Sequence, residues 1–262
     1  CLNCITRTGF SNNEHGYLYQ TVSQLFSLRS VNVGERRLDY IDAFRAPSGH
    51  VRDNYAEFGF PAERIHVIPH PLDDKFLVNH SSDFSEPIKF LYVGYLEKQK
   101  GVDKLIPILD GLKKRDFKVQ LTVAGTGGLR SKMEEQARES GIEQYVDFLG
   151  FVSNEELPSL YADHDVFVHP GTWEEPLARV YIEALATGTP IVTRQYGSID
   201  SIIGGGGVTT DGSGEDFTRT LATLINEERL PALSTAAKTQ FGRYDRGRIV
   251  SQVEEVYNSL SA

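Results

Sequence analysis

The chain alternates short apolar segments with segments of helical periodicity from residue 87 onward, and this alternation constrains its fold more than any other feature. Several of the apolar segments are almost continuous runs, as in strands of a parallel sheet that is covered on both faces. The expected strands cover residues 88–94, 118–125, 145–150, 165–170, 189–193 and 206–210. The expected helices cover about residues 102–115, 129–140, 154–162, 177–187, 197–203 and 214–226. Repeated strand–helix units of this kind predict a right-handed, doubly wound parallel α/β domain.

The first 80 residues do not share this pattern, because they are mixed and polar, with one helical pattern at residues 17–28. Near their end come a strand-like segment, a helix and a second strand, which reads IHVIP. Pro69 and Pro71 stop this second strand, so we place a linker at residues 70–87. The expected parts of the chain are one domain at residues 1–80, the doubly wound domain at residues 81–240, and a terminal helix at residues 241–262.

The charge balance restricts the kind of ligand. The 27 basic and 36 acidic residues give a net charge of −9, which disfavours a nucleic-acid partner because that role needs a basic face. A local basic pocket for a phosphorylated ligand is compatible with this balance. No apolar run approaches the roughly 18 residues that span a membrane, and the first residues lack the pattern of a signal peptide. We therefore expect a cytoplasmic protein.

The residue types that bind metals are sparse and poorly spaced. Cys1 and Cys4 form a single C-x-x-C pair with only His15 nearby, whereas a structural zinc site needs about four ligands. We interpret the pair as free thiols and expect no metal. His164 and His169 lie at opposite ends of the fourth expected strand, and we interpret both as structural. The chain starts at a cysteine rather than at Met, and we expect it to be a fragment of a longer protein.

Lysines follow the first expected strand of the doubly wound domain. Ligands of such sheets bind at the carboxyl ends of the strands, and Lys98, Lys100 and Lys104 surround the start of a helix there. A cation at that end opposes the helix dipole by about 0.3–1 kcal/mol, so the lysines suit an anion held between them and the helix amides. The alternative is a solvated basic turn. Lys100, followed by Gly101, is the best candidate for a phosphate ligand.

Two glutamates follow the fourth expected strand. Glu175 lies in a loop and Glu183 lies eight residues on, about two helical turns, so both side chains face one cleft. A carboxylate in a helix as apolar as that around Glu183 is unfavourable without a partner. Either a pair of ligand hydroxyls or a salt bridge to Arg179 supplies such a partner.

The segment VAGTGGLR has part of a dinucleotide-binding fingerprint, with Gly125 and Gly127 after a strand. Arg130 occupies the position of the third glycine, and Asp147 falls inside a strand rather than at its end. A nicotinamide site is therefore disfavoured. Trp173 suits either stacking on a base or sugar or plain packing.

Taken together, these segments resemble one family. The order IHVIPHPLDDKF, FLYVGYLEKQKG, VAGTGG, DFLGFVS and EPLARVYIEALATGTPIV is similar to that of family-4 glycosyltransferases of the GT-B fold, the "glycosyl transferases group 1". The resemblance runs from about residue 35 to the C-terminus. Its most specific part is the E-x7-E motif, here Glu175 to Glu183. It implies a GT-B fold, with a Rossmann-like C-terminal domain and part of a second α/β domain.

The resemblance implies transfer of a sugar, with retention of configuration, from a UDP-sugar or GDP-sugar without a metal or other cofactor. Lys100 and backbone amides at the start of the E-x7-E helix would bind the diphosphate, and Glu183 the ribose hydroxyls. Glu175, the implied catalytic residue, would contact the donor sugar, and residues 149–152 would lie beside the base. The implied donor-binding residues are Gly94, Tyr95, Lys100, Gly150, Phe151, Val152, Ala178, Arg179 and Glu183.

The chain departs from the family pattern at two positions of this site. Tyr95 stands where the family often has Arg, so one phosphate contact is absent or supplied elsewhere. Ala178 stands where the family usually has Gly, and its Cβ restricts the approach of the backbone to the phosphates.

The N-terminal part is shorter than an acceptor domain of this fold, and the family's glycine loop and active-site histidine have no counterpart in it. We therefore expect an incomplete N-terminal domain, with Arg243–Leu260 packing back toward it, and no transferase activity of the isolated chain. The expected acceptor is a sugar or a lipid-linked acceptor, with peripheral contact to the cytoplasmic face of a membrane through the missing part. The alternatives are a catalytically silent donor-binding subunit and a sugar-nucleotide epimerase, which the E-x7-E motif disfavours.

Overall fold

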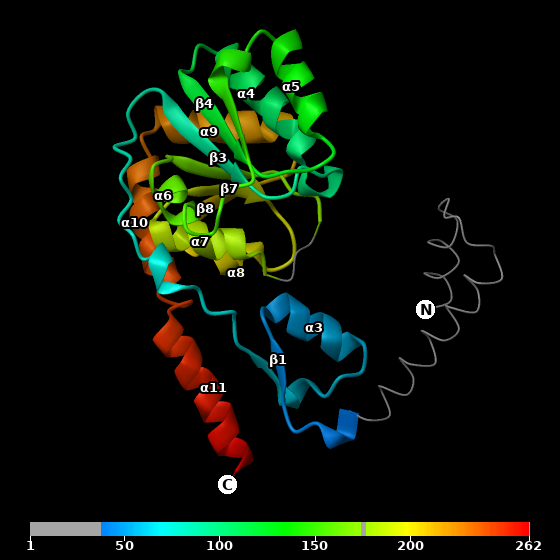
Figure 1. Cartoon of the computed structure of the whole chain (residues 1–262). Coiled ribbons are helices and arrows are strands. Elements are labelled where there is room, and N and C mark those ends of the chain that lie inside the picture. The colour runs from blue at the N-terminus through cyan, green and yellow to red at the C-terminus, as the bar shows by residue number, and fades with distance from the viewer. Residues whose placement is uncertain (1–37, 174–176, 262) are drawn as a thin grey trace, which may run out of the picture.

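The computed structural model describes residues 38–173 and 177–261 of the chain. The helix expected at residues 17–28 lies outside the described residues, as do Cys1, Cys4 and Glu175. The described part of the chain forms a six-stranded sheet with helices on both faces and a smaller unit built on two strands (Figure 1).

All strands of the large sheet are parallel, in the order β5-β4-β3-β6-β7-β8. The strands are β3 (Ile88–Val93), β4 (Val119–Ala124), β5 (Val146–Gly150), β6 (Val166–His169), β7 (Ile191–Arg194) and β8 (Gly207–Thr210). The chain winds outward from β3 to β5, then returns to β6 and winds outward to β8. The reversal between β3 and β6 is the switch point at which doubly wound sheets bind ligands. The expected doubly wound fold is confirmed, and every strand begins inside the range expected for it.

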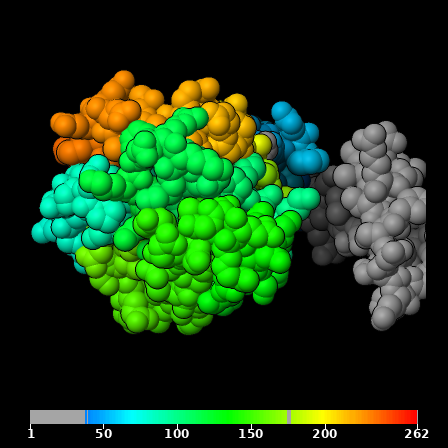
Figure 2. All heavy atoms as spheres, turned by 90° about the horizontal axis from the view of Figure 1, so that it is seen from above, coloured from blue at the N-terminus to red at the C-terminus, as the bar shows by residue number. Residues whose placement is uncertain are grey.

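Helices cover both faces of this sheet, because successive side chains of a strand point to opposite faces. Along β3, Phe90 and Tyr92 belong to one apolar core, and Leu91 and Val93 belong to the other. The helices of the first face are α4 (Leu105–Lys113), α5 (Arg130–Glu139) and α9 (Gly214–Asn226). The helices of the second face are α6 (Leu157–Ala162), α7 (Arg179–Thr187) and α8 (Ile199–Ile203). Figure 1 shows the two layers, and Figure 2 looks down on the first, where the green segments of α4 and α5 cover the sheet.

One helix has no counterpart among those expected from the sequence. α10 (Leu230–Phe241) packs against α7. Only Leu230, Leu233 and Ala237 of this helix are buried, so its apolar stripe is too narrow to stand out in the sequence. A proline in its first turn is tolerated, because the missing N–H has no partner within the helix at that position.

The smaller unit consists of β1 (Phe44–Ala46), α3 (Gly49–Glu57) and β2 (Ile65–Val67), the strand, helix and strand expected before the linker. β1 and β2 pair in parallel. Ser48 caps α3, because its hydroxyl accepts a hydrogen bond from the N–H of Val51 (3.4 Å). α3 starts on the side of the smaller unit that faces the large sheet (Figure 1).

The terminal helix α11 (Arg246–Leu260) leaves the sheet domain and runs beside the smaller unit (Figure 1). Asp245 caps this helix by accepting a hydrogen bond from the N–H of Arg248 (3.0 Å). Its last turns share an apolar hollow of about 410 Å³ with residues 40–45. None of the helices in residues 38–173 and 177–261 combines the length and the apolar character of a membrane span.

Candidate functional site

The turns that follow β3, β4 and β5 surround a hollow at the carboxyl edge of the sheet. Its volume is about 190 Å³, and most of its lining is apolar. The lining residues are Val93, Gly94, Tyr95, Ala124, Gly125, Thr126, Phe151, Val152 and Leu157. Three strands of one parallel sheet end at this edge, so four of the predicted donor-binding residues come together although they lie far apart in the sequence.

Glycines let these turns pack backbone against backbone. The N–H of Gly125 donates to the carbonyl of Gly150 (2.7 Å), and a Cβ at Gly125 would lie only 1.8 Å from the carbonyl oxygen of Gly94. Tyr95 and Phe151, which are 70% and 81% exposed, stand at the rim of the hollow. Exposed aromatic rings beside an apolar hollow can stack on a planar base.

Lys100 ends a short 3-10 turn, Lys98–Lys100, that packs against the loop after β6. Gly101 follows it with a φ of 67°, and a Cβ at Gly101 would lie 1.9 Å from the carbonyl oxygen of Pro170. The backbone N–H of Thr172 donates to the carbonyl of Gln99 (3.0 Å). Lys100 is therefore held at the switch point between β3 and β6.

Lys104 has a separate role. Its ammonium group donates to the carbonyl of Gly212 (2.5 Å), in the loop that follows β8. The helix begins only at Leu105, and Lys98–Lys100 forms a turn of its own before it. Lys104 thus joins the start of α4 to the loop after β8, the edge strand of the sheet.

A buried polar network lies below the Lys100 turn. His169 ends β6, and its Nδ1 lies 2.7 Å from the hydroxyl of Tyr181 on α7, which lies 2.9 Å from the hydroxyl of Thr193 on β7. Burial, and secondly the charge of Lys100, lower the pKa of His169 from 6.5 to about 3. The ring is therefore neutral at physiological pH. The network fixes the position of α7 relative to the ends of β6 and β7.

The amino end of α7 is built to accept an anion. Ala178 is its first flanking residue, and in the described part of the chain no side chain caps the helix and no acidic residue lies in its first turn. Free N–H groups and the helix dipole favour a negative charge at such an end. The φ of Ala178 is −71° and its ψ is 119°, an extended conformation that any residue adopts. Alanine in place of the family's glycine therefore causes no backbone strain.

Glu183 is 5% exposed, on the face of α7 that packs against α6. Its Oε2 accepts a hydrogen bond from the hydroxyl of Tyr161 (3.2 Å), and its Oε1 lies 3.7 Å from Nε of Arg179. The second distance allows an ion pair but is too long for a hydrogen bond. Burial raises the pKa of Glu183, and the charge of Arg179 opposes this rise. Among the described residues, Oε1 accepts no hydrogen bond.

Glu175, the expected catalytic residue, lies in the segment 174–176, outside the described residues. Trp173, just before this segment, is 63% exposed. Arg130 donates to the carbonyl of Phe148 (3.2 Å) and pairs with a glutamate on its own helix, so its guanidinium occupies the end of β5. Within residues 38–173 and 177–261, no three His, Cys, Asp or Glu side chains gather as a metal site.

The sequence pattern gave no sign of a cationic environment where the linker meets α7. Burial lowers the pKa of His70, and the charges of Arg45 and Arg179 lower it further. Arg45 is fixed by a hydrogen bond to the carbonyl of Ile68 (2.8 Å). Arg45 belongs to β1, His70 to the linker and Arg179 to α7, so no local sequence motif could predict that they lie near one another.

The family model for glycosyl transferases group 1 matches residues 74–240. The chain belongs to this family. It is 33% identical over 160 residues to an uncharacterised glycosyltransferase of Methanocaldococcus jannaschii, with 56% of this chain and 40% of that protein covered. It is 29% identical over 160 residues to the mannosylfructose-phosphate synthase of Agrobacterium fabrum, with 55% of this chain and 35% of that protein covered. The chain thus spans well under half the length of these two relatives.

Solved structures share the fold at lower sequence identity. The Anabaena protein HepE in complex with UDP and glucose has a TM-score of 0.71 and 22% identity, with 92% of this chain and 68% of that chain covered. The apo form of the lipopolysaccharide outer core galactosyltransferase WaaB has a TM-score of 0.69 and 24% identity, with 84% of this chain and 63% of that chain covered. These likenesses confirm the expected GT-B type fold.

Proposed function

We propose that this chain provides the donor site of a family-4 glycosyltransferase, which transfers a sugar from a UDP-sugar or GDP-sugar to an acceptor hydroxyl with retention of configuration. One observation carries the proposal. The apolar hollow, the Lys100 turn and the uncapped start of α7 all lie at the carboxyl edge of one sheet, beside its switch point. Membership of the glycosyl transferases group 1 supports the same activity.

The nucleoside base lies in the hollow between the β3, β4 and β5 turns. The rings of Tyr95 and Phe151 flank it, and the backbone of Gly94 and Gly125 lines the hollow between them. A volume of about 190 Å³ suits one planar base rather than a whole nucleotide. The sugar and phosphates then extend from the base toward α7.

The diphosphate lies between Lys100 and the amino end of α7. The buried link from His169 to Tyr181 joins the strand under Lys100 to this helix, so the two positive groups keep a fixed separation. When the bond between C1 of the donor sugar and the diphosphate oxygen breaks, the electron pair stays on that oxygen. A lysine and preorganised N–H groups stabilise this developing charge.

The ribose hydroxyls donate to Glu183. Tyr161 holds Oε2, while within residues 38–173 and 177–261 Oε1 has only the ion pair with Arg179 at 3.7 Å and can accept a ligand hydroxyl. Glu175 is proposed, from the family resemblance alone, to contact the donor sugar. The acceptor hydroxyl, on a sugar or a lipid-linked acceptor, bonds to C1 and gives its proton to the diphosphate oxygen that leaves C1 with the electron pair.

Calorimetric titration with UDP, GDP and uridine tests the donor site. Binding of one nucleoside diphosphate is expected, and at a hundred times its Kd it stabilises the fold by about 2.7 kcal/mol. Glu183→Gln is expected to weaken UDP and uridine binding alike, because both ligands carry the ribose. Failure to bind any nucleoside diphosphate would refute the proposal, and unchanged binding by Glu183→Gln would remove the ribose contact.

A further inference from the structure

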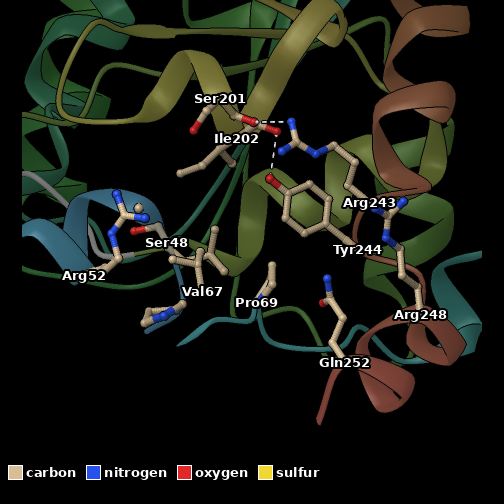
Figure 3. Close-up of a pocket in the computed structure, with 13 residues that line it drawn as sticks. Ser48, Arg52, Val67, Pro69, Ser201, Ile202, Arg243, Tyr244, Arg248 and Gln252 are labelled. Atoms are coloured by element: carbon tan, nitrogen blue, oxygen red, sulfur yellow. Dashed lines mark hydrogen bonds between the residues drawn. The ribbon is translucent and has the colours of Figure 1, made fainter. Parts of the chain in front are cut away.

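A second hollow, of opposite character, lies where the smaller unit meets the sheet domain (Figure 3). Its volume is about 330 Å³. The residues that line it are Pro47, Ser48, Gly49, Arg52, Val67, Pro69, Leu177, Ser201, Ile202, Arg243, Tyr244, Arg248 and Gln252. Three of these residues are arginines and none carries a carboxylate. In a chain with a net charge of −9, such a concentration of positive charge indicates an anionic ligand.

The three arginines approach the hollow from different elements. Arg52 comes from α3 on one side, while Arg243 and Arg248 come from the junction of α10 and α11 on the other (Figure 3). Arg52 pairs with Asp53 at 2.7 Å. Among the described residues, Arg243 reaches only the carbonyl of Ser201, at 3.4 Å. Within the described parts of the chain, the guanidinium of Arg248 has no hydrogen bond or ion pair. Among the described residues, at least two of the three guanidinium groups thus have no carboxylate partner.

The start of α3 adds a second kind of anion-binding group. Ser48 and Gly49 line the hollow, and the first turn of this nine-residue helix has no acidic residue. Ser48 accepts the N–H of Val51, and the N–H groups that remain at this end, together with the helix dipole, favour an anion between the start of α3 and the two arginines of the opposite side. Helix amides and arginine forks together match the oxygens of a phosphate group.

Ser201 and Gln252 add uncharged polar side chains to the lining of the hollow. The Oε1 atom of Gln252 is buried, so this side chain meets a ligand through its amide NH2 group. A serine hydroxyl and an amide NH2 group can both bond to the hydroxyls of a ligand. Tyr244 holds the junction of α10 and α11 against α8 by donating to the carbonyl of Ile202 (3.0 Å). The lining therefore suits a ligand that carries both a phosphate and hydroxyls.

The hollow lies beside the proposed donor site. Leu177 lines it, and the next residue, Ala178, flanks the amino end of α7. We infer that the hollow binds a phosphorylated monosaccharide that serves as the acceptor, an inference that rests on the proposed glycosyl transfer. A volume of about 330 Å³ is at the lower end of the range for small-molecule sites, roughly 300–1,000 Å³, which favours one small ligand.

Isothermal titration calorimetry with glucose 6-phosphate, glucose and inorganic phosphate tests this inference. Glucose 6-phosphate is expected to bind at least about tenfold more tightly than glucose, as expected for charge-assisted hydrogen bonds to arginine. Arg248→Gln is expected to remove most of this preference, and Arg248→Lys to keep part of it, because lysine retains the charge but loses the fork. Arg243→Gln is a second variant that removes an arginine of the same hollow.

Arg246→Gln is the matched control. Arg246 lies in the same turn of α11 as Arg248, but its Nη1 pairs with Oδ2 of Asp74 at 3.8 Å. This variant is expected to bind glucose 6-phosphate as the unaltered chain does, with circular dichroism showing that every variant is folded. Equal affinities for glucose and glucose 6-phosphate would overturn the inference, as would a preference that survives both Arg243→Gln and Arg248→Gln. Binding to phosphatidylinositol vesicles without binding to glucose 6-phosphate would overturn it in favour of a membrane surface. A parallel UDP titration tests the donor site separately.

Discussion

The sheet domain and the smaller unit are held together in different ways. The strands of the sheet domain lie between two apolar cores, and α9 alone buries five residues. In the smaller unit each strand has three residues, and α3 buries none. Likewise, α11 buries only Ile249 among its described residues. The sheet domain is therefore the stable scaffold, whereas the stability of the smaller unit depends on the segments that pack against it.

This difference separates the two proposed ligand sites. The donor site lies on strand ends that the cores fix, with a buried network that joins His169 and Tyr181 beneath it. The arginine hollow lies at the joint between the two regions and takes residues from both of them. We expect the donor site to be preformed and the arginine hollow to depend on how the regions are placed.

The largest effect is expected from matched core substitutions. Phe217 is fully buried in α9, whereas Phe44 in β1 packs edge-on against Phe60 (ring centroids 5.2 Å apart) and is only partly buried. Phe217→Ala is expected to lower the free energy of unfolding by about 3–5 kcal/mol. Phe44→Ala is expected to leave the main urea transition within about 1 kcal/mol. Equal losses in the two variants would show one cooperative unit and contradict the comparison.

The next effect concerns the donor site of the scaffold. Lys100→Ala is expected to weaken UDP binding about tenfold to a hundredfold, the loss of a hydrogen bond to a charged group, and to leave uridine binding unchanged. Lys98→Ala is the control, because Lys98 lies in the same exposed turn and the proposal gives it no phosphate contact. Calorimetry of both ligands measures the difference. Similar losses for UDP and uridine would contradict the assignment of Lys100 to the diphosphate.

The buried network makes the stability of the sheet domain depend on pH. Burial lowers the pKa of folded His169 to about 3, while the unfolded chain binds a proton at this residue below about 6.5. The contribution of His169 is thus complete above pH 6.5 and is lost as the pH falls, at up to about 1.4 kcal/mol per unit. Burial raises the pKa of Glu183, so the contribution of Glu183 to the stability increases as the pH falls, opposite to that of His169.

A comparison of the unaltered chain with His169→Gln isolates this contribution. Urea unfolding between pH 6.5 and pH 5 is expected to show a shallower loss of stability in the variant, since glutamine binds no proton. Parallel slopes in the two proteins would mean that His169 binds its proton with the same pKa in the folded and unfolded states.

Sequence pattern predicted the sheet because each of its strands is a separate apolar run that lies between helices. The rule that ligands bind at carboxyl ends pointed to Lys100, while the family resemblance implied Gly94, Tyr95 and Phe151, which line one hollow. The contact of Tyr161 with Glu183 was not predictable, because it depends on how α6 packs against α7. The arginine hollow was equally hidden, since Arg52 of α3 lies about 190 residues before Arg243 and Arg248 at the junction of α10 and α11, and the three form no motif.

The smallest effect is expected where the chain departs from its family. Ala178 precedes α7 with a φ of −71° and a ψ of 119°, values that alanine adopts as easily as glycine. Ala178→Gly is therefore expected to change UDP affinity less than about twofold and to lower the free energy of unfolding by about 0.5–1 kcal/mol, because glycine gains freedom in the unfolded chain. Calorimetry and urea unfolding measure the two effects. A large gain in UDP affinity would mean instead that the methyl group of Ala178 stands between the phosphates and the amides of α7.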